Sequence, residues 1–78
     1  MARDGNRRQS AIYHITVQGE LDAAWQEWFS GMMITTDQNK DGAVAILEGL
    51  VADQAALRGI LNKLWDLNLT IISLERDA

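Results

Sequence analysis

Residues 32–47 read MMITTDQNKDGAVAIL and contain two strand-like runs, Met32–Thr36 and Ala43–Leu47, separated by the polar segment Asp37–Gly42. The segment ends in an Asp-Gly step. Such a step between two strand-like runs is a strong hairpin signal, because the tight turn needs a residue with positive φ. We therefore predict a β-hairpin at the centre of the chain.

Two further strands are predicted on either side of this hairpin. Residues Ile12–Val17 are rich in β-branched and aromatic types, and their alternation places Tyr13, Ile15 and Val17 on one face. Residues Leu69–Leu74 alternate more loosely and are rich in isoleucine, which indicates the last strand before the charged C-terminal residues.

Two helices are predicted between these strands. The first has apolar residues at helical spacing and a stop at Gly31; its apolar residues are Leu21, Trp25, Trp28 and Phe29. The second begins after the N-cap residue Asp53 and ends at Asn68; its apolar stripe is Leu57, Ile60, Leu61 and Leu64. We expect the tryptophans, including Trp65, to lie in the core or at its edge.

The resulting order is strand, helix, strand, strand, helix, strand. Right-handed crossovers then place both helices on one face of a four-stranded antiparallel sheet. We therefore predict an α+β fold, a ferredoxin-like βαββαβ sandwich, as a single domain over residues 11–78. Residues 1–10 contain Arg3, Arg7 and Arg8 and are expected to form a disordered basic tail.

Composition and charge exclude several classes of protein. The 78-residue chain has no cysteine, which excludes disulfide scaffolds, thiolate zinc sites and thiol catalysis. Its longest aliphatic run, Ala43–Leu47, is far too short to span a membrane, and no signal-peptide core is visible, so we expect a cytoplasmic protein without a membrane partner. Residues 1–10 carry +2 of the net charge of −4, so the rest of the chain carries −6 and is expected to repel nucleic acid.

Two motifs resemble those of a known family. An opening of the form V-x-G-x-L-D-x-x-W-x-x-W-F-x-G runs from Val17 to Gly31, and a D-Q-A-A-L-x-G block runs from Asp53 to Gly59. Together they resemble a family of short bacterial proteins of unknown function. The chain departs from the family pattern at Leu50 and Thr70, where such proteins often have proline. The resemblance supports the fold and implies no activity.

A calcium-like pattern overlaps the predicted hairpin. Asp37, Asn39, Asp41, Gly42 and Glu48 satisfy the spacing D-x-[DN]-x-[DN]-G-x5-E of an EF-hand loop. An EF-hand needs a helix entering the loop, however, and the preceding residues are strand-like. A polar hairpin loop is therefore the favoured interpretation, and divalent-cation binding is the alternative.

His14 is the only histidine in the chain. Without a cysteine or a second histidine it cannot anchor a conventional zinc or copper site, and no catalytic triad can be assembled around it. We expect no cofactor, no metal and no catalytic residue. A small dimeric-barrel enzyme that uses His14 for proton transfer is a second alternative.

The predicted sheet leaves one face without helices. The residues expected on that face form a candidate self-association surface: His14, Thr16, Val44, Ile46 and Ile71. Apolar patches of this kind commonly mark association surfaces, and a 78-residue domain gains core by dimerising. We therefore predict a non-enzymatic interaction or ligand-sensing module that is homodimeric, with a second copy of itself or another protein as partner.

Overall fold

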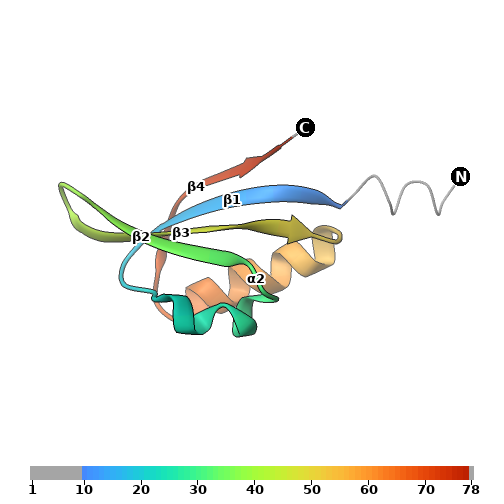
Figure 1. Ribbon diagram of the computed structural model, residues 1–78, viewed down its shortest axis with the longest axis horizontal. Coiled ribbons are helices and arrows are strands. Elements are labelled where there is room, and N and C mark those ends of the chain that lie inside the picture. Colours follow the sequence, from blue (N-terminus) through green and yellow to red (C-terminus); the bar gives the residue numbers. More distant parts are fainter. Residues whose placement is uncertain (1–9, 78) are drawn as a thin grey trace, which may run out of the picture.

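The structure of the protein, a computed structural model, describes residues 10–77 (Figure 1). Its elements in chain order are the strand β1 (Ala11–Gln18), the short turns η1 (Ala23–Trp25) and η2 (Glu27–Phe29), the strands β2 (Met33–Asn39) and β3 (Gly42–Val51), the helix α2 (Gln54–Asp66) and the strand β4 (Thr70–Arg76). The disordered tail predicted at residues 1–10 falls outside the described residues, apart from Ser10.

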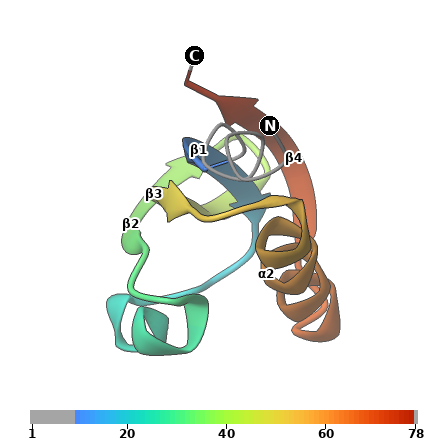
Figure 2. The same ribbon diagram turned by 90° about the vertical axis from the view of Figure 1, so that its right-hand side faces the viewer.

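The four strands form one sheet in the order β2-β3-β1-β4, and every neighbouring pair is antiparallel. The helix α2 and the two turns lie on the same side of this sheet (Figure 2). The predicted α+β class with a four-stranded antiparallel sheet is therefore confirmed. The prediction of two helices is wrong for the described residues, because α2 is the one α-helix and only short turns connect β1 to β2.

The region predicted as the first helix is two 3-10 turns with Asp22 as N-cap. Its backbone hydrogen bonds join residues three apart, as from Gln26 N to Ala23 O at 3.1 Å. Residues three apart eclipse each other in this geometry, which brings the rings of Trp25 and Trp28 to a centroid distance of 5.1 Å. A segment this short does not form a stable α-helix by itself, so its contacts with the rest of the domain decide which type of helix it adopts.

A contact with β2 anchors these turns. The side-chain Oε1 of Gln26 accepts a hydrogen bond from the backbone N of Ile34 at 3.2 Å. After η2 the chain reverses through two residues with positive φ, Ser30 at 61° and Gly31 at 77°. This reversal leads directly into β2.

The core lies between the sheet and the layer formed by α2 and the turns. It is made of alternate residues of the strands together with one face of α2, and its fully buried large side chains are Phe29, Ile15, Met32, Leu47, Leu64, Val17 and Val51. The three tryptophans are not part of it. Trp25, Trp28 and Trp65 are 38%, 42% and 55% exposed, so of the two expected positions, in the core or at its edge, the core is wrong; the ring of Trp28 packs against the ring of the buried Phe29.

The predicted hairpin and the predicted second helix are both present. The strands β2 and β3 pair up to Asn39 and Gly42, which leaves Lys40 and Asp41 as the turn and makes both strands longer than predicted. The positive φ lies at Gly42, at 121°. In α2, the Asp53 side chain caps the backbone N of Ala56 at 2.8 Å. The helix ends before Asn68, which has the expected positive φ of 65°.

A β-bulge in β4 changes which of its residues face the core. The register between β1 and β4 shifts after Thr16, which pairs with Ser73, so that Val17 pairs with Ile71 and Ile72 is the extra residue. Ile71 packs against the core, while Ile72 is exposed. The prediction that Ile71 lies on the helix-free face is therefore wrong, because strict alternation fails at the bulge.

Candidate functional site

The helix-free side of the sheet, called the open face below, is the first candidate site. Directly paired residues of antiparallel strands share a face, and the core residues Ile15 and Val17 define the other side. The pairing therefore assigns alternate residues of β1, β3, β2 and β4 to the open face. They are Ile12, His14, Thr16, Gln18, Val44, Ile46, Glu48, Leu50, Met33, Thr35, Asp37, Asn39, Thr70, Ser73 and Glu75.

Four of the five predicted self-association residues lie together on this face. His14, Thr16 and Ile46 are half-buried, and Val44 is buried among its neighbours. The fifth, Ile71, packs on the core side. The structure thus groups the predicted residues of β1 and β3 and separates the one from β4.

Three apolar residues of the open face were missed by sequence reasoning. Met33 is 59% exposed, Leu50 is 64% exposed, and Ile12 is paired directly with Leu50. The predicted third strand ended at Leu47, whereas β3 continues to Val51. Continuing the period-two alternation through Glu48 and Gly49 would have placed Leu50 on this face.

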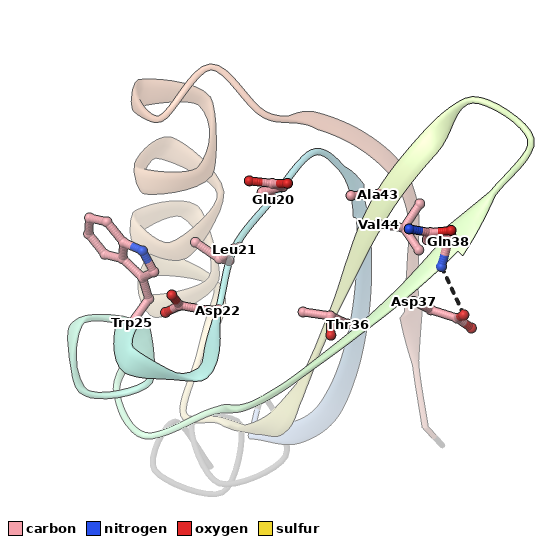
Figure 3. Close-up of a pocket in the computed structure, with 9 residues that line it drawn as sticks. All are labelled: Glu20, Leu21, Asp22, Trp25, Thr36, Asp37, Gln38, Ala43 and Val44. Carbon is pink, nitrogen blue, oxygen red and sulfur yellow. Dashed lines mark hydrogen bonds between the residues drawn. The ribbon is translucent and has the colours of Figure 1, made fainter.

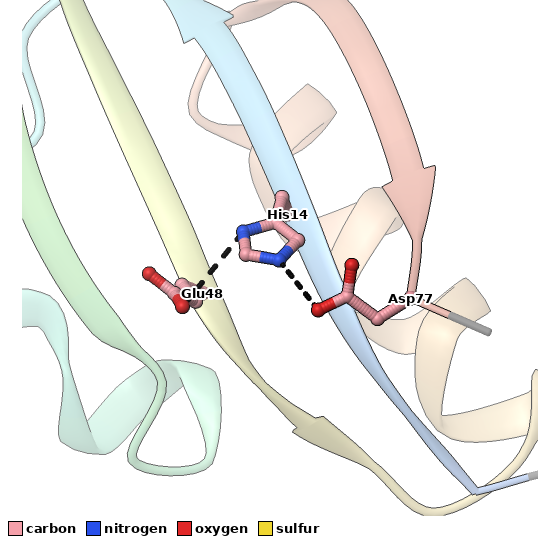
Figure 4. A network of polar contacts seen from close by, with 3 residues as sticks. All are labelled: His14, Glu48 and Asp77. Carbon is pink, nitrogen blue, oxygen red and sulfur yellow. Dashed lines mark hydrogen bonds and ion pairs between the residues drawn. The ribbon is translucent and has the colours of Figure 1, made fainter.

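His14 is the centre of a polar network on the open face (Figure 4). Its Nε2 lies 3.1 Å from Oδ2 of Asp77, and its Nδ1 lies 3.9 Å from Oε2 of Glu48. Glu48 and Glu75 are its direct cross-strand partners on β3 and β4. One imidazole is thus surrounded by three carboxylates, Glu48 from β3 and Glu75 and Asp77 from the end of β4 and the residue that follows it.

This surrounding raises the pKa of His14 above its ordinary value of 6.5. The hydrogen bond to Asp77 is the largest cause, and the negative charges of Asp77, Glu48 and Glu75 add to it, while partial desolvation opposes it. Both ring nitrogens face carboxylates, so the ring is not placed to activate a hydroxyl nucleophile. The network therefore favours a charged, structural histidine over a catalytic one.

A cleft near the tip of the hairpin is the second candidate site (Figure 3). Its volume is about 730 Å³, and it lies between the segment that follows β1 and the outer half of the β2–β3 hairpin. The lining residues are Glu20, Leu21, Asp22, Trp25, Thr36, Asp37, Gln38, Ala43 and Val44. His14 is not among them, so the cleft does not provide the pocket that an enzyme using His14 requires.

The residues of the calcium-like pattern do not converge. Asp37 and Asn39 belong to β2, and Asp37 pairs with Val44, four residues before Glu48 on the extended strand β3. At about 3.3 Å per residue this separates the two acidic positions by roughly 13 Å, too far to share one ion. Within residues 10–77, no group of three or more His, Asp or Glu side chains could hold a metal ion.

A family model described as a domain of unknown function, DUF8691, matches residues 12–75. The match covers most of the chain. The chain belongs to the DUF8691 family. This agrees with the resemblance to a family of unknown function, although the motifs quoted for that resemblance are not tested by the match.

The DUF8691 match covers all four strands and α2 almost completely, so the open face and the cleft both belong to the family domain. No significant match was found among the curated proteins or among the solved structures. In the part of the chain that the structure describes, no helix is long and apolar enough to cross a membrane.

Proposed function

We propose that this DUF8691 domain is a non-enzymatic interaction module that forms a homodimer by packing its open face against the same face of a second copy. One observation carries the proposal: within residues 10–77 no layer covers the open face, yet it exposes Met33, Leu50 and Ile12, with the half-buried Ile46 on the other side of the His14–Glu48 pair. Sheets commonly pack face to face at a separation of about 10 Å, with apolar side chains between them.

The size of the open face suits a dimer. Eight residues of β1 at about 3.3 Å each give a length of roughly 26 Å, and four strands at about 4.8 Å give a width of roughly 19 Å. The projected area is therefore about 500 Å², and side-chain relief raises the accessible area further. This approaches the ~800 Å² per partner that a stable interface buries.

A C2 axis also keeps the acidic network of one copy away from that of the other. His14 and its cross-strand partner Glu48 lie two residues along the strands from the pair Thr16 and Ile46, a separation of about 6.6 Å. An axis near Ile46 places the two networks on opposite sides of the interface. The apolar residues near the axis then meet without opposing like charges.

The test is the mass of the protein in solution after a charge is introduced on the open face. Ile46→Asp and Leu50→Asp should convert the dimer to a monomer, because each places an unpaired carboxylate in an apolar interface. Trp65→Asp is the matched control for Leu50→Asp, since Trp65 is 55% exposed against 64% for Leu50 but lies on α2. Light scattering should give twice the chain mass for the unmodified protein and for the control.

Two results would contradict this proposal. One is a monomeric mass for the unmodified protein at millimolar concentration. The other is a dimeric mass for the folded Leu50→Asp variant. Leu50 is exposed in the single copy, so the substitution should disturb the interface without unfolding the domain. Amide NMR spectra of each variant should confirm that the domain is folded.

We further infer that the fold is a ferredoxin-like arrangement in which the first helix is replaced by η1 and η2. The central position of β1 and β3 in the sheet supports this, as does the helical layer on one side only. Backbone proton contacts measured by NMR test it. They should link β1 to both β3 and β4, and contacts between β1 and β2 instead would overturn it.

A further inference from the structure

The cleft arises because the β2–β3 hairpin extends past the layer that covers the rest of the sheet. Near its tip, Thr36, Gln38 and Ala43 are left beside the segment Glu20–Asp22 and the turn η1. In Figure 3, Leu21, Asp22 and Trp25 form one side of the cleft, and the hairpin forms the other. The volume of about 730 Å³ lies within the range of small-molecule sites, roughly 300 to 1,000 Å³.

The hairpin that forms one wall is held in place by specific contacts. Gly19 N donates a hydrogen bond to Ala43 O at 2.8 Å, which ties the start of the Glu20–Asp22 segment to β3. Gln18 exchanges side-chain hydrogen bonds with Asn39, at 3.2 Å and 2.9 Å, next to the turn of the hairpin. The two walls are thus joined at the base of the cleft, so the cavity does not depend on an unattached loop.

The lining of the cleft suits a positively charged ligand. It includes the carboxylates of Glu20 and Asp22 and contains no lysine, arginine or histidine. Asp37 also lines it, but its carboxylate accepts a hydrogen bond from Gln38 N and points away from the opposite wall (Figure 3). Thr36 and Gln38 add polar side chains to the hairpin wall.

Trp25 supplies an aromatic wall, an independent feature that also suits a cation. Its ring packs against the ring of Trp28, and Lys63 Nζ lies 5.3 Å from the centroid of Trp28. This aromatic pair therefore already holds one ammonium group, at Trp28, which does not line the cleft. Trp25 itself is 38% exposed, and no cation of residues 10–77 lies over its ring. A ring face of this kind attracts ammonium and guanidinium groups.

We propose that this cleft binds a small organic cation, an alkylammonium or guanidinium compound, between Trp25 and the carboxylates of Glu20 and Asp22. The volume calls for an extended molecule rather than a single ion, and the described residues hold no metal-ligand cluster. The same cation can come from a free amine or from an arginine side chain of a peptide. Glu20, Asp22 and Trp25, which would contact the cation, lie outside the open face, whereas Val44 and Asp37 belong both to the lining of the cleft and to the open face.

The experiment measures binding of agmatine and of a decapeptide with the chain's own residues 1–10, which contain three arginines. Amide NMR shifts of the labelled protein should be saturable and centred on residues 20–25 and 36–44. Putrescine should bind, whereas 1,4-butanediol, its uncharged analogue, should not. Saturable agmatine binding identifies a free-amine site, and binding of the peptide alone identifies an arginine side chain as the source of the cation.

Variants assign the effect to the cleft. Trp25→Leu should weaken binding by about 3- to 10-fold through loss of the ring face. Glu20→Gln should weaken it by several-fold, and so should Asp22→Asn, in which asparagine keeps the N-cap of η1. Glu27→Gln and Trp65→Leu are the matched controls, because both residues are exposed and lie outside the cleft.

Two results would overturn the proposal. One is the absence of saturable shifts with agmatine, with putrescine and with the decapeptide, each at millimolar concentration. The other is equal affinity for the unmodified protein and for folded Glu20→Gln and Trp25→Leu variants.

Discussion

Gly19 is the position where the fold depends most sharply on the absence of a side chain. Its φ is 135°, a conformation that residues with a Cβ rarely adopt, and an added Cβ would overlap Cδ2 of Leu69. The backbone conformation costs about 1 to 3 kcal/mol for a residue other than glycine. Displacing the buried Leu69 side chain adds about 1 to 3 kcal/mol, the usual cost of overpacking.

Gly19→Ala should therefore lower the free energy of unfolding by about 2 to 6 kcal/mol. Two other glycines separate the cost of the backbone conformation from the cost of the contact with Leu69. Gly31 has a φ of 77° but open space around it, so Gly31→Ala should cost only about 1 to 2 kcal/mol. Gly59 lies inside α2 with open space and no positive φ, so Gly59→Ala should stabilise the protein by about 0.8 to 1 kcal/mol.

Urea denaturation followed by far-ultraviolet circular dichroism measures this series. A domain of this size has a stability of only ~3 to 5 kcal/mol, so Gly19→Ala can leave too little folded protein for a full transition. The variant should then be made in the Gly59→Ala background, because the two sites are separate and their effects should add. A loss for Gly19→Ala no larger than that for Gly31→Ala would refute the role assigned to the Leu69 contact.

Two further predictions concern His14 and Asp53. The folded pKa of His14 is raised above its ordinary value of 6.5, so its contribution to stability should be fully present below pH 6.5 and be lost as the pH rises through the folded pKa. Urea midpoints measured against pH should show this loss for the unmodified protein and not for His14→Gln; parallel profiles would contradict it. Asp53→Ala removes the cap on Ala56 N and should cost about 1 kcal/mol, whereas Asp53→Asn should cost little, and equal losses for the two would argue against the cap.

The elements predicted correctly from the sequence depend on local chemistry. The Asp-Gly step specifies the central hairpin, and Asp53 and Asn68 mark the two ends of α2. The alternation in β1 identified Tyr13, Ile15 and Val17 as core residues, and all three are buried. The turn, the helix caps and the alternation each depend on residues that are close together in the chain, so they can be recognised from the sequence alone.

The candidate sites were only partly predictable. The open face was foreseen through His14, Thr16, Val44 and Ile46, because period-two alternation places residues on a face once the strand is known. Asp77 was not foreseen as a partner of His14, since it lies 63 residues away and only strand pairing brings it near. The cleft was not foreseen either, because it depends on how far the hairpin extends past η1.

The sequence by itself determined the hairpin, α2 and the antiparallel α+β class, because turn residues, caps and alternation act locally. Only the tertiary structure decided that residues 23–29 form 3-10 turns, since an apolar stripe this short suits either helix type. The contact of Gln26 with Ile34 and the packing of Trp25 on Trp28 favour the tighter form. The bulge at Ile72, which turns Ile71 toward the core, likewise follows from pairing with β1 rather than from the pattern of β4 alone.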